Sequence, residues 1–226
     1  MRKRNANNIA IIVAAGSSRR YGGKTPKQYL EITGKSILRL VVEKFNNHPD
    51  IDAVIVSVNN NSVAMYKSAV SGIDLLPHVI GGETRQKSVC NALEKIKNYS
   101  PKKVLIHDAA RILVDEDIIS DLISELDRSK AVIPASNVRD TIKYAENNII
   151  KKTIPRDNLF LAQTPQAFEY ETILNLHRKY SDLDFTDDSS LCEHDGLDVS
   201  IVDSSMLNFK ITTKEDFELA KKILGK

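Results

Sequence analysis

The sequence is poor in the residues that build disulfide frameworks and metal sites. It has two cysteines in 226 residues, and Cys90 and Cys192 lie far apart without forming a CxxC pair. This count argues against a disulfide scaffold or a cysteine-based zinc site, and it fits a reducing compartment. The five histidines show neither HxxxH nor HExxH spacing, so the sequence also lacks the common histidine metal motifs.

Long apolar runs and an excess of one charge are missing too. No run approaches the ~18–20 residues that cross a membrane. The basic stretch 1–8 precedes only a short apolar run, which makes a poor signal peptide. The 32 Lys and Arg residues nearly balance the 30 Asp and Glu residues, for a net charge of +2. This balance argues against a protein that coats nucleic acid with a generally basic surface, but it permits a locally basic pocket. We expect a cytoplasmic protein with neither a nucleic-acid nor a membrane partner.

What the sequence does contain is a regular alternation of apolar runs and amphipathic stretches. The apolar runs predict strands at 9–15, 53–58, 75–80, 104–106, 131–134, 159–168, 199–202 and 209–211. Helical spacing predicts helices at 36–45, 88–96, 118–126 and 170–179, one from about residue 186, and a last one opened by a capping box from Thr213 to Asp216. This order predicts an α/β fold with a mostly parallel sheet flanked by helices.

Residues 138–156 interrupt this alternation. Two short strands, 141–144 and 149–154, flank an Asn-rich turn and predict a β-hairpin. No linker, repeat or low-complexity stretch is evident in the sequence. We therefore predict one domain over residues 1–226 with an inserted β-hairpin arm at about 138–156, where a dimerisation or substrate-capping element would lie.

A glycine-rich basic loop, residues 16–24, follows the first predicted strand. Its glycines let backbone N–H groups approach an anion, which the cations neutralise. The loop is not a dinucleotide fingerprint, because Ser18 and Arg19 occupy glycine positions. It is not a P-loop either, because Ser18 replaces the leading glycine and Pro26 biases Thr25 away from the helical conformation. A solvated basic loop is the alternative, but ligands of open α/β sheets bind at the carboxyl ends of strands.

Two further segments follow predicted strands at the same edge of the sheet. Asp108, in the sequence HDAAR at 107–111, can hold a hydrated Mg²⁺ that bridges triphosphate oxygens. A helix cap or an ion pair with Arg111 is the alternative. Residues 81–88 join a strand to a helix, and their glycines allow a flat base to lie against the backbone while Ser88 reads the base edge. A plain loop is the alternative there.

Other polar residues give weaker signals. Lys210 lies between Phe209 and Ile211 in an apolar strand pattern, where it faces either a site or solvent. The sequence QTPQ at 163–166 interrupts an apolar segment, whereas TDDS at 186–189 is explained by a helix cap alone. No Ser/His/Asp or Cys/His set and no isolated carboxylate pair is evident, which gives no support to triad or glycosidase chemistry.

Together these segments resemble one known family, the 2-C-methyl-D-erythritol 4-phosphate cytidylyltransferases. The resemblance covers about residues 9–220 and rests on eight segments in the same order: AAG…RR at 14–20, PKQY at 26–29, GG…R…SV at 81–89, HDAAR at 107–111, VRDTIK at 138–143, TPQAF at 164–168, TDDS at 186–189 and KIT at 210–212. The related ribitol- and pentitol-phosphate cytidylyltransferases share the loop, PKQ and TPQ. They typically carry HDSVR and lack VRDT, so these two segments favour the methylerythritol enzyme.

The resemblance implies a Rossmann-like fold of the nucleotidyltransferase type. It also implies attack of a phosphomonoester oxygen on the α-phosphorus of CTP, with release of pyrophosphate and with Mg²⁺ or another divalent cation. The family's catalytic roles fall on Arg20 and Lys27, and its metal-organising role falls on Asp108. Its nucleotide contacts fall on Ala14, Ala15, Gly16, Gly82, Glu83, Arg85, Ser88, Asp108 and Ala109. Its substrate-positioning roles fall on Arg111, Thr141, Thr164, Thr186, Lys210 and Arg156.

The resemblance further implies a homodimer joined through the β-arm, with Arg156 reaching into the partner's active site. Three residues depart from the family pattern, because Glu83 stands for the usual Asp, Ile112 for Pro and Asp188 for Glu. Two other functions stay open. A ribitol 5-phosphate or related polyol-phosphate cytidylyltransferase would use the same cations. A non-catalytic nucleotide-binding module would have no need of them, and their presence argues against it.

Overall fold

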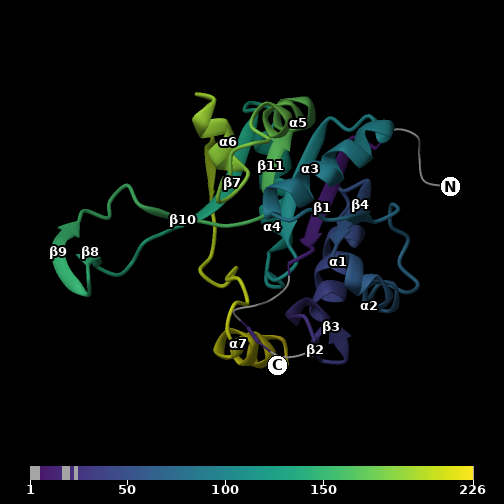
Figure 1. Ribbon diagram of the computed structural model, residues 1–226, viewed down its shortest axis with the longest axis horizontal. Helices are drawn as coiled ribbons and strands as arrows, with labels where there is room; N and C mark the ends of the chain where they lie inside the picture. The colour runs from purple at the N-terminus through teal and green to yellow at the C-terminus, as the bar shows by residue number, and fades with distance from the viewer. Residues whose placement is uncertain (1–5, 17–20, 23–24, 226) are drawn as a thin grey trace.

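The computed structural model describes residues 6–16, 21–22 and 25–225. Within them, a mixed eight-stranded sheet forms the centre of the molecule and carries helices on both faces (Figure 1). The strand order is β10-β7-β11-β6-β1-β4-β5, and β12 pairs with β7. The strands are β1 (Asn8–Ala14), β4 (Ala53–Val58), β5 (Val79–Ile80), β6 (Lys103–Asp108), β7 (Ala131–Asn137), β10 (Phe160–Ala162), β11 (Gln166–Glu169) and β12 (Ser200–Asp203).

The direction of the strands confirms the predicted α/β architecture. β1 pairs in parallel with β4 and β6, β4 with β5, and β7 with β12. β11 runs antiparallel to β6 and β7, and β10 runs antiparallel to β7. The sheet is therefore mostly parallel, with antiparallel pairing confined to the β10–β11 segment.

The middle strands are buried on both faces. All six residues of β4 are buried, and Ile9, Ile11 and Ile12 of β1 are fully inaccessible. Parallel strands covered by helices on both sides have this continuous apolar pattern. The register of β1 and β6 sets Val13 beside Asp108, so the loops that leave these two strands lie next to each other.

Two apolar cores lie on the two faces of the sheet. α1 (Ile37–Asn47) and α4 (Glu116–Glu125) contribute to one core, and α3 (Arg85–Ile96) and α5 (Tyr170–Lys179) to the other. The remaining α-helices of the described chain are α2 (Val63–Ala69), α6 (Ser189–His194) and α7 (Lys214–Leu224). Ser36 and Thr84 cap α1 and α3 through their side chains. The capping box predicted at Thr213 and Asp216 is present at the start of α7.

Shorter elements complete the described chain. They are the 3-10 helices η1 (Lys27–Tyr29), η2 (Asn60–Ser62) and η3 (Lys97–Tyr99), and two short strands, β2 (Glu31–Ile32) and β3 (Lys35–Ser36), which pair antiparallel with each other. None of the described helices has both the length and the apolar character required to cross a bilayer.

The predicted hairpin is present and stands apart from the main sheet. β8 (Ile142–Glu146) and β9 (Ile149–Ile154) pair antiparallel with each other in a sheet of their own. Asn147 and Asn148 between them have φ of 49° and 63°, as a tight hairpin turn requires. Figure 1 shows this β-arm extending away from the body of the molecule. The division of the chain into a single domain stays a prediction.

Two strand predictions were too long. Of residues 75–80, only Val79 and Ile80 join the sheet, although the Leu76 N–H donates to the Val54 carbonyl at 2.9 Å. The apolar pattern there reflects the burial of Leu76 and not its pairing in a strand. The predicted strand 159–168 is divided into β10 and β11 by residues 163–165, where Pro165 has no N–H to donate to a ladder.

Two other predictions were wrong in kind or position. Residues 209–211 are not a strand, because Ile211 donates its N–H to the Ala110 carbonyl (2.9 Å) in a segment that joins no sheet. The helix predicted from about Thr186 begins at Ser189 instead, and α3 begins at Arg85, three residues before the predicted start.

Candidate active site

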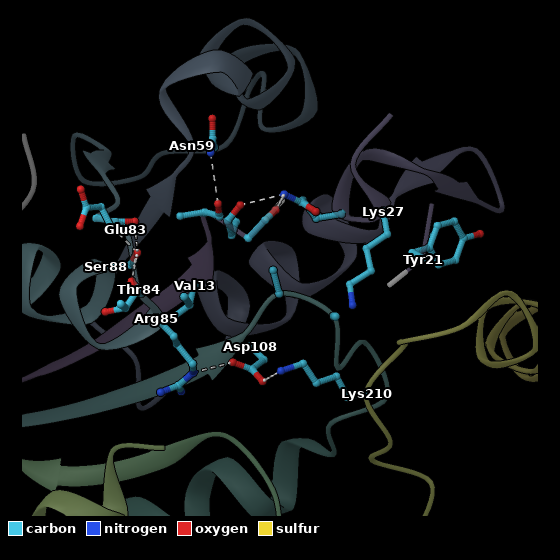
Figure 2. A pocket seen from close by; sticks show the side chains of 17 residues that line it. Val13, Tyr21, Lys27, Asn59, Glu83, Thr84, Arg85, Ser88, Asp108 and Lys210 are labelled. Carbon is cyan, nitrogen blue, oxygen red and sulfur yellow. Dashed lines mark hydrogen bonds and ion pairs between the residues drawn. The ribbon is translucent and has the colours of Figure 1, made fainter. Parts of the chain in front are cut away.

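A cavity of about 540 Å³ lies where β1, β4, β5 and β6 end (Figure 2). This volume is within the range of small-molecule sites, and its place at the carboxyl ends of parallel strands is the usual one for α/β folds. Every residue that was predicted to contact the nucleotide lines it: Ala14, Ala15, Gly16, Gly82, Glu83, Arg85, Ser88, Asp108 and Ala109. Lys27 and Lys210 line it as well. The structure thus brings eleven predicted residues from five segments of the chain to one cavity.

Two amide side chains fix the backbone where it leaves β1. Gln28, which is buried, donates from Nε2 to the carbonyls of Ala14 (2.8 Å) and Gly16 (3.1 Å). Asn59, just after β4, donates from Nδ2 to the Ala15 carbonyl at 3.4 Å. With these carbonyls occupied, the backbone of residues 14–16 has a fixed course along the cavity wall. This is a structural reason for the PKQ sequence at 26–28.

The adjoining wall of the cavity includes Gly82, in the turn at Gly81 and Gly82. The Gly82 N–H donates to Ser88 Oγ (3.1 Å), and the Ser88 hydroxyl donates to the Thr84 carbonyl (2.8 Å). A Cβ on Gly81 would lie 2.4 Å from the Ala15 Cβ and 2.8 Å from Ser88 Oγ. Glycine is therefore required at position 81, because the turn lies so close to Ala15. The Ser88 hydroxyl holds the turn by bonding to backbone groups of Gly82 and Thr84.

The resemblance to the cytidylyltransferases implies CTP as the ligand, so we expect Gly81→Ala to weaken CTP binding at least tenfold, about 1.4 kcal/mol, because the new methyl group must push the turn away from Ala15. Calorimetric titration with CTP measures this. Gly196→Ala is the control, because Gly196 has a φ of +78° and no atom near its missing Cβ, so alanine strains the backbone far from the cavity. Gly196→Ala should lower the melting temperature without changing the dissociation constant. Equal CTP affinities for Gly81→Ala and the wild type would contradict the role given to this turn.

Both signs of charge line the cavity, and Asp108 lies on its floor between Arg85 and Lys210. Of the described lining residues, Lys27, Arg85 and Lys210 are cations, and Glu83 and Asp108 are anions. The Asp108 carboxylate lies 3.2 Å from Arg85 Nε through Oδ1 and 2.6 Å from Lys210 Nζ through Oδ2 (Figure 2). Burial by itself would raise the pKa of Asp108, but Arg85, Lys210 and Arg111 outweigh it and hold that pKa well below its usual range. Asp108 is therefore ionised at neutral pH.

The two lysines approach the cavity from different sides. Figure 2 shows Lys27 above and Lys210 below the same open region. Lys27 Nζ donates to the Ile211 carbonyl at 2.5 Å, which ties η1 to the segment that carries Lys210. Arg20, the other predicted catalytic residue, lies outside the described residues.

Arg111 and Thr164 lie behind the cavity floor and do not line it. Arg111 Nη1 donates to the Asn208 carbonyl (2.7 Å). Burial and the nearby charge of Arg85 lower the pKa of Arg111, and Asp108 offsets them only in part. Thr164 is buried, and its hydroxyl accepts from the Asp108 N–H (3.1 Å) and lies 3.1 Å from His107 Nδ1. Burial lowers the pKa of His107 to about 3, so its ring is neutral. Its Nε2 donates to the Arg111 carbonyl (3.0 Å), so Nδ1 is the acceptor and the Thr164 hydroxyl donates to it. Thr164 thus supports the backbone of Asp108, whereas Arg111 is bonded to the segment that leads to Lys210.

The other predicted positioning residues do not line the cavity of their own chain. Thr141 and Arg156 are exposed residues next to β8 and β9, and Arg156 donates to the Arg139 carbonyl. Thr186 is exposed before α6, with its hydroxyl 3.4 Å from Ser190 Oγ. The structure of one subunit therefore brings together the nucleotide residues but not these three.

Several lining residues were not predicted: Val13, Tyr21, Gln28, Asn59, Thr84 and Ala110. The sequence contained an indication for two of them, because Gln28 belongs to the PKQ segment and Thr84 lies inside the 81–88 segment. Tyr21 packs edge-on against Phe217 of α7, with ring centroids 6.3 Å apart, a contact that only the tertiary fold creates. Asn59 had no signal beyond its place after a strand.

The described chain also brings together Ser120, His48 and Asp50, although the sequence showed no such set. Ser120 Oγ lies 3.3 Å from His48 Nε2 and 3.3 Å from Asp50 Oδ2. His48 Nδ1 accepts from the Asp50 N–H, so Nε2 carries the proton, and it lies 3.2 Å from the Glu116 carbonyl. A ring nitrogen that carries a proton cannot take one from Ser120, so this cluster ties the end of α1 to α4 and is not a triad.

The fold and the cavity, with three cations in its described lining, fit the nucleotidyltransferase class, whose chemistry depends on positioning and charge neutralisation rather than on a protein nucleophile. Comparison with known families is more specific. The sequence model of the 2-C-methyl-D-erythritol 4-phosphate cytidylyltransferase (IspD) family matches residues 8–226, and the chain belongs to this family.

Individual relatives agree with the family match. The chain is 40% identical over 219 residues to the 2-C-methyl-D-erythritol 4-phosphate cytidylyltransferase of Caldicellulosiruptor saccharolyticus, which covers 96% of each chain. It is 40% identical over 216 residues to the bifunctional enzyme IspD/IspF of Paramagnetospirillum magneticum, covering 96% of this chain and 56% of that protein. The chain spans about half the length of the first bifunctional relatives it matches (53–56%).

Solved structures show the same fold. The 4-diphosphocytidyl-2C-methyl-D-erythritol synthase of Anaerococcus prevotii superimposes with a TM-score of 0.85 at 30% identity, covering 97% of this chain and 96% of that one. The 2-C-methyl-D-erythritol 4-phosphate cytidylyltransferase of Francisella tularensis gives a TM-score of 0.81 at 37% identity, covering 96% and 99%.

Proposed function

We propose that this protein transfers a cytidylyl group from CTP to 2-C-methyl-D-erythritol 4-phosphate, giving 4-diphosphocytidyl-2-C-methyl-D-erythritol and pyrophosphate. The observation that carries the proposal is the cavity at the strand ends, where all nine predicted nucleotide residues meet Lys27 and Lys210. Membership of the family over residues 8–226 supports the choice of CTP and of the methylerythritol substrate.

The reaction forms one phosphorus–oxygen bond and breaks another. An oxygen of the phosphomonoester attacks the α-phosphorus of CTP, and the bond from that phosphorus to the α–β bridging oxygen breaks, so pyrophosphate leaves with the bonding electrons. A phosphate dianion must approach a triphosphate of about −4 charge, so repulsion has to be neutralised before the reacting atoms meet. Lys27 and Arg20 stabilise the charge that gathers on the transition state and leaving group, and Lys210 holds the attacking phosphate.

Asp108 fits a magnesium ion of the kind that accompanies a nucleoside triphosphate. Magnesium takes few protein ligands, typically one or two carboxylates, and completes its shell with phosphate oxygens and water. Asp108 is one ionised carboxylate at the cavity floor, and the described residues hold no cluster of three or more acidic, histidine or cysteine ligands. The ion would neutralise triphosphate charge, and Lys210 would exchange its contact with Asp108 for the substrate phosphate.

We further propose that two copies of the chain form the enzyme. A lone two-stranded hairpin is marginally stable in water, yet the β-arm exposes Tyr144, Ile149 and Ile150 by 46%, 60% and 62%. Near its base, Phe160 and Leu161 of β10 are 40% and 46% exposed. A second copy that packs on this apolar surface would cover it. The partner's Arg156 and Thr141 would then reach the cavity that they do not reach in their own chain.

The two free cysteines support a cytoplasmic location.

The proposed substrates are tested by pyrophosphate release with purified protein and Mg²⁺. We expect turnover with CTP and 2-C-methyl-D-erythritol 4-phosphate, and rates at least about 100-fold lower with ATP or GTP, because a pyrimidine-sized pocket excludes purines. Ribitol 5-phosphate is the matched alternative acceptor. Equal or faster turnover of ribitol 5-phosphate would move the protein to the pentitol-phosphate enzymes. Binding of CTP without pyrophosphate release from any acceptor would favour a non-catalytic module.

A further inference from the structure

A chain of paired charges leads from the cavity into the protein interior. Lys210 Nζ pairs with Asp108 Oδ2 (2.6 Å), and Asp108 Oδ1 pairs with Arg85 Nε (3.2 Å). Arg85 Nη1 then pairs with Asp188 Oδ2 at 2.7 Å, and Asp188 Oδ1 lies 3.2 Å from His177 Nε2. Lys210, Asp108 and Arg85 line the cavity, whereas Asp188 and His177 do not. Their side chains are only 1% and 0% exposed, so neither can touch a bound nucleotide directly.

Asp188 is held in place from several elements. Gln166 of β11 accepts through Oε1 from the backbone N–H groups of Asp188 (3.0 Å) and Ser189 (3.1 Å). The same amide donates through Nε2 to Asp187 Oδ2 at 2.7 Å. His177 of α5 supplies the contact to the carboxylate itself. The start of α6 is therefore fixed against β11 and α5, and the carboxylate that faces Arg85 cannot shift without breaking these bonds.

Two carboxylates from different segments of the chain share the Arg85 guanidinium: Asp108 contacts its Nε and Asp188 its Nη1. Burial alone would raise the pKa of Asp188, but Arg85 and His177 hold it below the usual value. A buried guanidinium that loses one of two carboxylates moves toward the other, because an unpaired buried charge is costly. Here the other carboxylate is Asp108.

We propose that Asp188, anchored by His177 and Gln166, is a positioning residue for the nucleotide cavity that acts through Arg85. It keeps Arg85 shared between two carboxylates and thereby keeps the guanidinium at the cavity wall and Asp108 available on the floor. The proposal deepens the proposed function, because it rests on CTP as the occupant of the cavity. It assigns a role to a residue that sequence reasoning explained as a helix cap.

The test compares Asp188→Asn with Asp188→Glu by calorimetric titration with CTP and Mg²⁺. The asparagine keeps the shape but removes the charge, so Arg85 should turn to Asp108 and the dissociation constant should rise at least about tenfold. The glutamate keeps the charge and should stay within about threefold of the wild type. Glu94→Gln is the control. It breaks an exposed ion pair between α3 and α5, Glu94 with Arg178 (2.6 and 2.8 Å), which lies outside the cavity lining, and should leave CTP affinity unchanged.

A double-mutant cycle separates positioning from a merely structural role. If Asp188 acts through Arg85, adding Asp188→Asn to Arg85→Gln should change CTP affinity by less than about twofold. His177→Leu should weaken binding by a smaller factor than Asp188→Asn, and this effect should also vanish with Arg85→Gln. It provides the same test if Asp188→Asn fails to fold in a thermal melt. Wild-type affinity in Asp188→Asn, or an equal loss with and without Arg85, would overturn the proposal. The titrations contain no polyol phosphate, so failure of the methylerythritol assignment would leave this comparison intact.

Discussion

Lys27→Ala is expected to lower kcat by about 10²–10³-fold while changing the dissociation constant of CTP by less than about threefold. The ammonium group of Lys27 lines the cavity, where negative charge gathers around the α-phosphorus and the departing pyrophosphate. An interaction that strengthens in the transition state appears in kcat when it is lost, whereas an interaction made equally in the ground state appears in binding. Steady-state pyrophosphate release and CTP titration measure the two quantities separately.

The control for this variant is Lys35→Ala. Lys35 is an exposed lysine whose ion pair with Glu43 (2.6 Å) lies outside the cavity lining, so its removal should leave both quantities unchanged. A thermal melt is needed as well, because Lys27 also donates to the Ile211 carbonyl. A stable Lys27→Ala enzyme with near-normal kcat and only a raised KM for CTP would show that Lys27 contributes ordinary ground-state binding.

The second large effect is the recovery of activity when two inactive variants are mixed. Lys27→Ala and Arg156→Ala should each be nearly inactive alone. In a mixed dimer, one site carries both lesions and the other receives an intact Lys27 and the intact Arg156 of the partner. Random exchange puts half of the molecules in mixed dimers, so roughly a quarter of wild-type activity should return. The exposed position of Arg156, outside the cavity lining of its own chain, is the reason to expect this.

Native mass measurement must first show that subunits have exchanged. If Arg156 served the cavity of its own chain, every site in the mixture would still carry one lesion and no activity would return. Exchange without recovery would therefore contradict the shared site. A single-chain mass at working concentration would contradict the dimer itself.

Much of the fold could be predicted because its signals are local. The unbroken apolar runs of β1, β4 and β6 are typical of strands covered on both faces, and the capping box at Thr213 marks the start of α7. The strand predictions at 75–80 and 209–211 failed where a residue is buried without pairing in the sheet. Leu76 and Ile211 are buried although neither lies in a strand of the sheet, and an apolar pattern alone cannot distinguish burial from strand pairing.

The nucleotide side of the site could be predicted because its residues lie in short segments directly after strands. Parallel strands deliver those segments to one edge, so sequence order was enough to group Gly16, Gly82 and Asp108. The pairing of charges was out of reach. A pair with Arg111 was only the alternative interpretation of Asp108, and nothing in the sequence indicated its partners Arg85 and Lys210, which are 23 and 102 residues away. The contact between Arg85 and Asp188 likewise depends on how α3 and α6 meet.

Phosphorus NMR of the complete reaction tests the central claim most directly. With CTP, Mg²⁺ and 2-C-methyl-D-erythritol 4-phosphate, the protein should consume CTP and the phosphomonoester in equal amounts. It should give pyrophosphate and a pair of mutually coupled signals from a new diphosphate bridge. CMP and pyrophosphate without those coupled signals would show hydrolysis instead of transfer. An unchanged spectrum, under conditions where CTP binds, would contradict the assignment of this cavity as a cytidylyltransferase active site.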